Sequence, residues 1–398
     1  MNQISGTRYL ETGLNYLETY NRWEKIEMKI YRKIEKSILS MMNWIWKIFI
    51  LIHEYKNIFY KRKLFKSVSL TSEQKKQIDS FYKKNYGKTI PYWWHQLYMS
   101  YTGKFDFQYI PEYIFSTKLE LLQNRRIDVL PFENKNMLSV IFGGGEKCFV
   151  RQPETLLMRV KGRYFDESRS IISEQNAVKK ITYCEGGNFV AFIKVTVDTS
   201  SGCGVRMLDM NTGIDQIENE EIQTIFNKMG KNFVVQKCIS PHPIFATLYP
   251  KAINTLRVVT YMTHDKIKVA PITLRIGQGG SVVDNAHAGG IFIGVSEEGK
   301  LLKEAFTEYQ KRYTVHPDTG VVFEGYQIPC VPQIRQVAIK LHEQVPMLQF
   351  VSWDFTVDKD GEVVLIEANL HSQAVWLAQM AHGRAMFGED TAEMLQMV

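Results

Sequence analysis

The stretch VSWDFTVDKDGEVVLIEANL, residues 351–370, alternates apolar and polar side chains on either side of an Asp-Gly dipeptide. Such a pair between two β-type runs predicts a hairpin with a two-residue type I′ turn. If Asp360 and Gly361 form that turn, counting back along both strands places Asp354 directly opposite Glu367. Asn369 follows two residues later and therefore shares their face of the hairpin.

Two carboxylates that face each other across paired strands lie about 5 Å apart. Their like charges raise each other's pKa unless a cation lies between them. A ligand set made only of oxygen atoms favours a hard ion, Mg²⁺ or Mn²⁺, over zinc. The face that carries Asp354, Glu367 and Asn369 is therefore a candidate metal site. The alternative is a solvated hairpin whose acidic residues simply face water.

The composition is that of a folded protein with more than one domain. The 398 residues are 45% hydrophobic and 12% aromatic, which is enough to bury two or three cores. The five cysteines are odd in number and form no C-x-x-C pair. This pattern favours reduced thiols and a cytoplasmic protein.

The formal charge of +7 belongs to the N-terminal segment, because residues 1–70 hold thirteen Lys/Arg and six Asp/Glu, whereas residues 71–398 hold 36 of each. An apolar run at 38–52 lies between basic clusters within residues 32–66. This pattern is typical of an interfacial helix that contacts anionic lipid at the inner face of a membrane. A helix packed on the rest of the protein with a solvated basic rim is the alternative. The run is too short and polar for a span of about 20 apolar residues, and no nucleic-acid-reading motif accompanies the charge, so no nucleic-acid partner is expected.

Short β-branched and aromatic runs separated by glycine turns predict strands from about residue 181 onward. The predicted strands are 189–196, 204–210, 233–239, 255–262, 266–276, 290–295, 350–357 and 363–369. Helical patterns fit residues 218–229, residues 332–344 and a segment after residue 372. This mixture of strands and intervening helices predicts an α+β or α/β protein.

A second informative stretch is NFVAFIKVTVDTSSGCGV, residues 188–205. An apolar strand carries Lys194 near its end, and a loop rich in Gly and Ser follows. Such a loop can close backbone N–H groups over phosphates while the ammonium group neutralises them. A Gly/Ser turn that joins two hairpin strands is the more common explanation of the same pattern.

The order of these parts resembles that of the ATP-grasp enzymes. A lysine, a Gly-rich loop, an apolar strand with Gln236, an arginine-bearing strand and a D…E-x-N hairpin follow one another between about residues 105 and 370. The chain most closely resembles the sugar-transfer-associated branch, and the similar stretches are INTLRVVTY (253–261), TLRIGQGGSVVDNAHAGGIF (273–292), VHPDTGVVFEGYQIP (315–329) and the hairpin. The N-x-H-x-G-G run at 285–290 is also similar to one in ATP-grasp glutamate ligases.

The resemblance implies an α+β ATP-grasp fold in which two α+β subdomains clamp ATP after a helical N-terminal region. The expected regions are a helical basic N-terminal region (1–105), the N-terminal lobe of the ligase (106–180), a lid and nucleotide subdomain (181–250) and a catalytic and metal-binding subdomain (251–398).

The resemblance also implies roles for single residues. The implied nucleotide-binding residues are Lys135, Lys194, Ser201, Gly202, Gly204, Gln236, Lys237 and Ile239. The implied catalytic residues are Arg257, Arg275, Asn285 and His287. The implied ligands of Mg²⁺ or Mn²⁺ are Asp354, Glu367 and Asn369. The alternative is that the two arginines are ordinary partners of acidic residues and that His287 only braces its loop.

The implied function is an ATP-dependent carboxylate–amine ligase that forms an amide through an acyl phosphate and releases ADP and phosphate. Its substrates would be a small-molecule carboxylate and an amine, and the family name suggests a sugar acid and an amino acid in polysaccharide or glycoconjugate biosynthesis. One alternative is a phosphotransferase that uses the same nucleotide site and forms no amide. Another is a non-catalytic binding protein at a membrane that uses the basic N-terminal segment.

Overall fold

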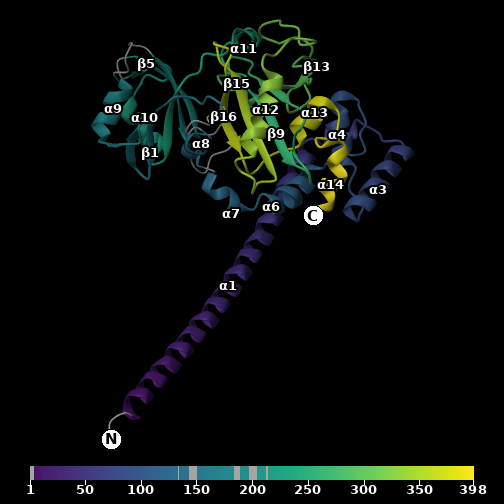
Figure 1. Ribbon diagram of the computed structural model, residues 1–398. Coiled ribbons are helices and arrows are strands. Elements are labelled where there is room, and N and C mark those ends of the chain that lie inside the picture. The colour runs from purple at the N-terminus through teal and green to yellow at the C-terminus, as the bar shows by residue number, and fades with distance from the viewer. Residues whose placement is uncertain (1–3, 133, 143–149, 183–188, 197–203, 212–213) are drawn as a thin grey trace. The chain divides into compact units, whose positions relative to one another are not determined.

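The computed structural model describes residues 4–132, 134–142, 150–182, 189–196, 204–211 and 214–398, with side chains from Glu27 onward (Figure 1). The chain divides into two compact units, residues 1–55 and residues 56–398. Both β-sheets belong to the second unit.

The described part of the chain up to residue 102 contains helices only. They are α1 (Ile4–Tyr60), α2 (Arg62–Lys66), α3 (Ser72–Tyr86) and α4 (Trp93–Thr102). Thr71 begins α3 with a capping box, because its side chain accepts from the Gln74 N–H and the Gln74 side chain accepts from the Thr71 N–H. No helix in the described residues is both long enough and apolar enough to cross a membrane.

Short helical segments connect this region to the first sheet. They are α5 (Glu112–Ile114), a π-helical turn (Phe115–Leu119), α6 (Glu120–Gln123), α7 (Arg126–Val129) and α8 (Leu138–Phe142). The ring of Phe115 packs at 5.3 Å against that of Phe350 in the second sheet. The segment is therefore part of the core beneath that sheet.

The first sheet has the strand order β3-β2-β1-β8-β4-β5-β6-β7, and all of its pairs are antiparallel. Its strands are β1 (Thr155–Val160), β2 (Arg163–Asp166), β3 (Ile171–Ile172), β4 (Phe189–Val195), β5 (Val205–Asn211), β6 (Ile214–Asp215), β7 (Glu220–Glu221) and β8 (Phe233–Lys237). Helices α9 (Glu174–Thr182) and α10 (Ile222–Met229) bury Ile181 and Phe226 in its core. Strands β1 to β3 precede residue 180 and β4 to β8 follow it, so this one sheet contains strands from both predicted regions, 106–180 and 181–250.

The second sheet has the order β14-β13-β12-β11-β9-β15-β16, and β10 pairs with β9 beside this path. Its strands are β9 (Leu256–Met262), β10 (Ile267–Val269), β11 (Thr273–Ile276), β12 (Ile291–Val295), β13 (Leu301–Phe306), β14 (Arg312–Tyr313), β15 (Phe350–Val357) and β16 (Val363–Asn369). The remaining helices are α11 (Pro243–Leu248), α12 (Val331–His342), α13 (Trp376–His382) and α14 (Thr391–Gln396).

Side chains alternate between the two faces of the second sheet. One face carries Trp353 and Phe355, which are buried in one core with residues of α12 such as Ile334. Figure 1 shows α12 lying across this sheet. The opposite face of β15 carries Asp354, so the strand that builds the core also positions a charged residue.

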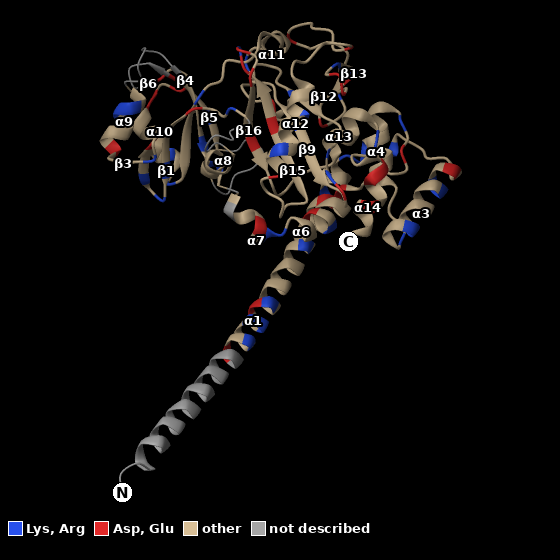
Figure 2. Cartoon of the chain, in the orientation of Figure 1, with Lys and Arg blue, Asp and Glu red and all other residues tan. Residues whose placement is uncertain are grey.

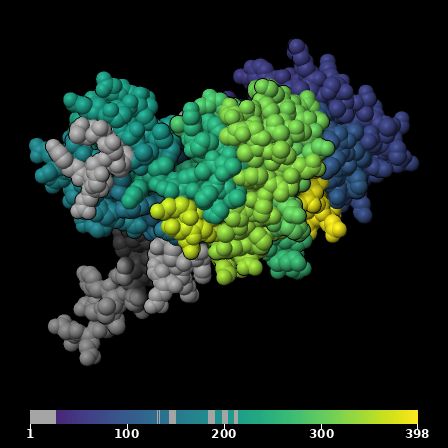
Figure 3. Space-filling view, turned by 90° about the horizontal axis from the view of Figure 1, so that it is seen from above, coloured from purple at the N-terminus to yellow at the C-terminus, as the bar shows by residue number. Residues whose placement is uncertain are grey.

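The α+β class predicted from the sequence is confirmed, and most of the predicted strands are present with ends shifted by two residues at most. The single strand predicted over 266–276 is wrong, because it breaks into β10 and β11 around Pro271. A proline has no N–H to donate to the ladder, so a continuous strand through this position is disfavoured. The space-filling view shows the region of the first sheet, in teal, and that of the second, in green, as adjacent parts of the surface (Figure 3).

Candidate functional site

Strands β15 and β16 form the predicted hairpin and place Asp354 opposite Glu367. The predicted two-residue turn is wrong, because residues 359–361 form a three-residue loop in which Gly361 adopts φ +84°. Ile366 has no partner in the register and forms a β-bulge. The longer turn uses one extra residue from the β15 side of the hairpin, and the bulge uses one extra residue of β16. The two shifts cancel, so Asp354 still pairs with Glu367 as predicted.

The carboxylate of Asp354 is buried between two guanidinium groups. Arg257 donates from Nε to Oδ1 at 2.6 Å and from Nη2 to Oδ2 at 3.1 Å, and Arg275 donates from Nη2 to Oδ2 at 3.1 Å. Burial would raise the pKa of Asp354, but the charges of the two arginines outweigh burial and hold that pKa below its ordinary value. Cations of the protein itself therefore lie beside this carboxylate.

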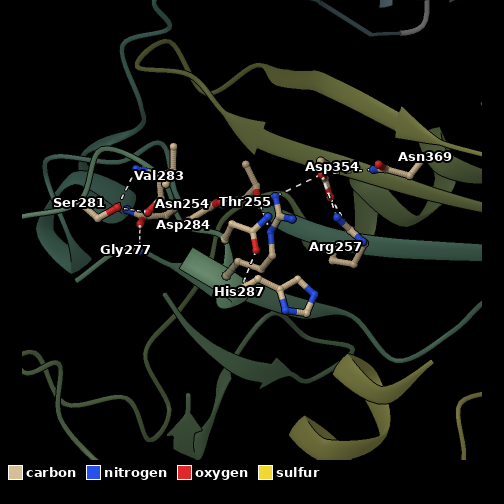
Figure 4. A network of polar contacts seen from close by, with 12 residues as sticks. Asn254, Thr255, Arg257, Gly277, Ser281, Val283, Asp284, His287, Asp354 and Asn369 are labelled. Carbon is tan, nitrogen blue, oxygen red and sulfur yellow. Dashed lines mark hydrogen bonds and ion pairs between the residues drawn. The ribbon is translucent and has the colours of Figure 1, made fainter. Parts of the chain in front are cut away.

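Arg275 links Asp354 to a second buried carboxylate, Asp284. Figure 4 shows Asp284, Thr255 and Asp354 from close by. Nε and Nη2 of Arg275 donate to the hydroxyl oxygen of Thr255 at 3.1 and 2.6 Å, and Nη2 lies 3.4 Å from Oδ1 of Asp284. Thr255 donates its N–H and its hydroxyl to Oδ2 of Asp284, both at 2.7 Å. Burial would lower the pKa of Arg275, but the charges of Asp284 and Asp354 raise it. The guanidinium group is thus charged and held in one orientation.

Glu367 faces two lysines. Its Oε1 atom lies 3.2 Å from Nζ of Lys135. Burial lowers the pKa of Lys194 on β4, and the charge of Glu367 opposes that effect. No hydrogen bond or ion pair joins Lys194 to another residue within the described ranges. Its ammonium group is therefore available to an anionic ligand.

One pocket collects these groups from both sheets. Its charged lining residues are Lys135, Lys194, Arg275, Asp284, Asp354 and Glu367, and its apolar lining includes Phe132, Leu138, Phe192, Val205, Ile253 and Ile366. Three cations and three carboxylates are combined with an apolar wall. Such a lining suits a ligand that has both a flat apolar part and a polyanionic part.

The predicted residues lie at different places relative to this pocket. Lys135, Lys194, Gln236, Arg275, Asp354 and Glu367 line it. Arg257 and Asn369 adjoin it through Asp354, since the side-chain amide of Asn369 lies 3.5 Å from Oδ2 of that residue. Ser201 and Gly202 lie outside the described residues, and Gly204 begins the described part after them with φ +72°.

The predicted residues Lys237 and Ile239 differ in their contacts. The side chain of Lys237 points to solvent and lies 3.6 Å from Glu154. The N–H of Ile239 donates to no backbone carbonyl of the described chain, whereas that of Cys238 donates to Val190. An N–H that lacks a backbone partner in the described chain can donate to a ligand.

Asn285 and His287 do not line the pocket. The side-chain oxygen of Asn285 accepts from the His287 N–H at 2.8 Å and caps a short turn. A Cβ atom on Gly290 would lie 2.4 Å from the carbonyl oxygen of Asp284, so only glycine allows this loop to close against Asp284. The ring of His287 lies 2.7 Å from Glu308.

The predicted metal ligands fit a hard cation through oxygen atoms alone. Asn369 uses only its amide nitrogen in the contacts above, and Glu367 uses one oxygen towards Lys135. Asp354 accepts one hydrogen bond on Oδ1, which leaves a lone pair on that atom. Within the described ranges, no three His, Cys, Asp or Glu side chains form a group suited to a metal. The proposed set therefore has two carboxylates, Asp354 and Glu367, and needs the side-chain oxygen of Asn369 as its third ligand.

Thr255 and Asp284 were not among the predicted site residues, although both lie in stretches that carry the resemblance. Asp284 directly precedes the N-x-H-x-G-G run, and Thr255 lies two residues before Arg257 on the same face of the chain. The alternation rule would have found Thr255. Nothing local in the sequence indicates that Asp284 is buried.

The family described as sugar-transfer associated ATP-grasp matches residues 114–394 of this chain. The comparison with curated proteins found no match.

The chain is also similar to solved structures at low identity. They include the VanG D-Ala:D-Ser ligase from Enterococcus faecalis, with 13% identity, a TM-score of 0.38 and coverage of 66% of this chain and 59% of that chain. D-alanyl-alanine synthetase A from Vibrio cholerae has 13% identity, a TM-score of 0.38 and coverage of 67% and 65%. The L-amino acid ligase from Bacillus licheniformis has 12% identity, a TM-score of 0.37 and coverage of 68% and 49%. This chain thus covers less than two thirds of each of these proteins.

Proposed function

Because the chain belongs to the sugar-transfer associated ATP-grasp family, we propose that it is an ATP-dependent ligase that joins a carboxylate to an amine. One observation carries this proposal: Lys135 and Lys194 lie in the same pocket as Arg275, Asp354 and Glu367. The proposed reaction transfers the γ-phosphoryl group of ATP to a carboxylate. An amine then displaces phosphate from the acyl phosphate and leaves an amide.

The nucleotide would lie with its base against the apolar wall and its phosphates against the lysines. Lys194 is the best supported contact, because it is half-buried in the pocket and makes no hydrogen bond or ion pair with another described residue. The N–H of Ile239 would donate to the base, and Gln236 would line the same side. The loop with Ser201, Gly202 and Gly204 would cover the phosphates and exclude water.

Glu367, Asn369 and Oδ1 of Asp354 would hold Mg²⁺ or Mn²⁺. A bound divalent ion neutralises charge on the phosphates, which lowers the repulsion between two anionic reactants. Arg257 and Arg275 belong to the same cluster and remain charged, so each can stabilise negative charge on the transferring group. Asp354, Asp284 and Thr255 hold these guanidinium groups in place.

The substrate class follows from the family description, and we propose a sugar acid and an amino acid in polysaccharide or glycoconjugate biosynthesis. A mass-resolved product screen tests this with ATP, Mg²⁺, pooled amino acids, pooled uronic acids and nucleotide sugars. Amide products that appear together with ADP and phosphate support the ligase. A phosphorylated acceptor without any amide would instead identify a phosphotransferase.

We also propose that residues 32–52, the first part of the segment predicted over 32–66, contact an anionic membrane surface from the cytoplasmic side. Lys61 and Phe65, near the end of that segment, are buried. The part of α1 within the first unit carries one polar stripe, and Figure 2 shows basic residues along it. The stripe consists of Lys29, Arg32, Lys33, Lys36, Ser40, Asn43 and Lys47. The rest of the helix surface exposes large apolar side chains, among them Phe49 and Ile52, together with the acidic residues Glu27 and Glu35. A basic stripe opposite a wide apolar face is typical of a helix that lies in the membrane interface.

A further inference from the structure

Glu308 joins the side chains of His287 and Lys61, which the reaction proposed above does not use. Its Oε2 atom lies 2.7 Å from Nδ1 of His287, and its Oε1 atom accepts from Nζ of Lys61 at 2.8 Å. Lys61 also lies over the ring of Trp376 at 5.1 Å, and that ring lies 5.6 Å from the His287 ring. These four residues, Lys61, His287, Glu308 and Trp376, form a cluster that we call the histidine cluster.

The carboxylate of the histidine cluster is held rigidly. Glu308 lies in the turn between β13 and β14, its side chain is 13% exposed, and its carbonyl accepts from the Tyr101 hydroxyl at 2.5 Å. Burial would raise the pKa of Glu308, but the hydrogen bond from His287 and the charge of Lys61 outweigh it and lower the pKa to about 2. Glu308 is therefore ionised at neutral pH and acts only as an acceptor.

An ionised carboxylate fixes the tautomer of the histidine that faces it. Because Glu308 can only accept, Nδ1 of His287 must carry the proton, and Nε2 of the neutral ring then has a free lone pair. Nε2 has no hydrogen-bond partner among the described residues. The side chain of His287 is 49% exposed, so this lone pair is open to a ligand.

The sheet places the histidine cluster near Arg275. Arg275 on β11 pairs directly with Phe292 on β12, so their side chains share one face of the sheet. The ring of Phe292 contacts that of Trp376 at 5.5 Å, and Trp376 contacts His287. The strands follow one another in the order β12, β11, β9 and β15, and Arg275 lies on β11. His287 therefore lies on the β12 side of Arg275, and Asp354 lies on its β15 side. The close-up view includes His287 together with Arg257 and Asp354 (Figure 4).

We propose that His287 accepts the proton of the amine that attacks the acyl phosphate, and that Glu308 and Lys61 are positioning residues for it. The amine nitrogen forms a bond to the carbonyl carbon, and the bond from that carbon to the phosphate oxygen breaks. The proton of the amine passes to Nε2 and then to the departing phosphate, so the ring returns to its starting state. This inference rests on the proposed ligase function and adds to it the site of the amine and its proton acceptor.

Hydroxylamine separates the ligase function from the proton-acceptor role of His287, because it attacks acyl phosphates without needing a base. The full-length protein is incubated with ATP, Mg²⁺ and pooled uronic acids, with either pooled amino acids or hydroxylamine as the nucleophile. We expect His287→Gln and Glu308→Gln to lower the rate of amide formation at least tenfold and to change hydroxamate formation less than twofold. Glu304→Gln is the matched control, because Glu304 lies four residues earlier and pairs with exposed Arg312 rather than with a histidine.

The outcomes are distinguishable. If the wild type forms neither product, the ligase function fails, whereas equal losses of amide and hydroxamate in His287→Gln would overturn only the proton-acceptor role. A second readout does not need activity: the ¹⁵N chemical shifts of the His287 ring should show the proton on Nδ1 in the wild type and in Glu304→Gln. They should show a mixture of tautomers in Glu308→Gln, and an unchanged Nδ1–H tautomer in that variant would overturn the positioning role.

Discussion

Arg257 and Asp354 lie side by side on neighbouring strands, and the guanidinium group of Arg257 contacts both carboxylate oxygens of Asp354 at 2.6 and 3.1 Å. This planar, two-point contact fixes the orientation of the carboxylate as well as its charge. Because Asp354 also faces Arg275 and Asn369, its orientation determines where the remaining oxygen lone pair points. The pair therefore sets the geometry of the proposed metal site.

Arg257→Lys keeps the charge but removes the two-point contact. We expect it to lower the free energy of unfolding by about 1–3 kcal/mol, because a lysine cannot satisfy both oxygens of a buried carboxylate. Arg151→Lys is the control, since Arg151 is 58% exposed and contacts Asp358 through one nitrogen. Its effect should stay within about 0.5 kcal/mol. Urea denaturation measures both values, and equal effects would count against the importance of the two-point contact.

Lys194→Met should separate ligand binding from stability. We expect the affinity for ATP, measured by calorimetry, to fall at least tenfold, because the ammonium group lines the pocket and makes no hydrogen bond or ion pair with another described residue. The fold should gain stability at neutral pH, since burial lowers the lysine pKa and charging it is unfavourable in the folded state. That gain should vanish as the pH rises to the ordinary lysine pKa of 10.5. Lys179→Met on the exposed surface of α9 is the control, and unchanged ATP affinity in Lys194→Met would remove Lys194 from the site.

The hairpin shows why part of the site was predictable from sequence. Asp354 and Glu367 face each other as expected, although the turn and the bulge at Ile366 each depart from the ideal hairpin by one residue. Local rules gave the right pair because Trp353 and Phe355 of β15 and Leu365 of β16 must face the same core, which restores the register. The capping box of Thr71 and Gln74 is similarly local.

Other parts of the site carried no local signal. Lys61 and Glu308 are 247 positions apart in sequence, and each looks like an ordinary surface residue until the fold brings them together. Strands β2 and β3 are too short to show alternation, with four and two residues. The family resemblance predicted that Lys194 and Glu367 belong to one site. The composition of the two segments around these residues gives no sign that they lie close together.

Glu308→Gln should change how stability depends on pH. The pKa of Glu308 is lowered to about 2 in the folded state, so its contribution is full above the unfolded pKa and is lost as the pH falls towards about 2. We expect the wild type to exceed the variant by an amount on the order of 2 kcal/mol between pH 6 and 7. The difference should narrow steadily below about pH 4.5. Denaturation curves from pH 7 to pH 3 check this, and a constant difference would contradict the assigned ionisation.

Neutralising the polar stripe of α1 should weaken membrane contact. Replacing Arg32, Lys33, Lys36 and Lys47 by glutamine should lower binding to phosphatidylglycerol vesicles at least tenfold, because each basic residue near an anionic surface contributes about 1 kcal/mol. The matched control replaces four exposed lysines of α3, namely Lys75, Lys76, Lys83 and Lys84. No vesicle binding by the wild type, together with a concentration-dependent oligomer in sedimentation, would identify a second copy as the occupant of the apolar face.

The most direct test of the central claim follows one oxygen atom. The protein is incubated with ATP, Mg²⁺, pooled amino acids and uronic acids labelled with ¹⁸O in the carboxylate, and the released phosphate is analysed by mass. If ATP activates a carboxylate in this pocket, each phosphate gains one ¹⁸O atom, because the bond between the carbonyl carbon and that oxygen breaks when the amine attacks. Glu367→Gln should abolish both ATP consumption and the label. ATP consumption by the wild type with no ¹⁸O in the phosphate would contradict the account.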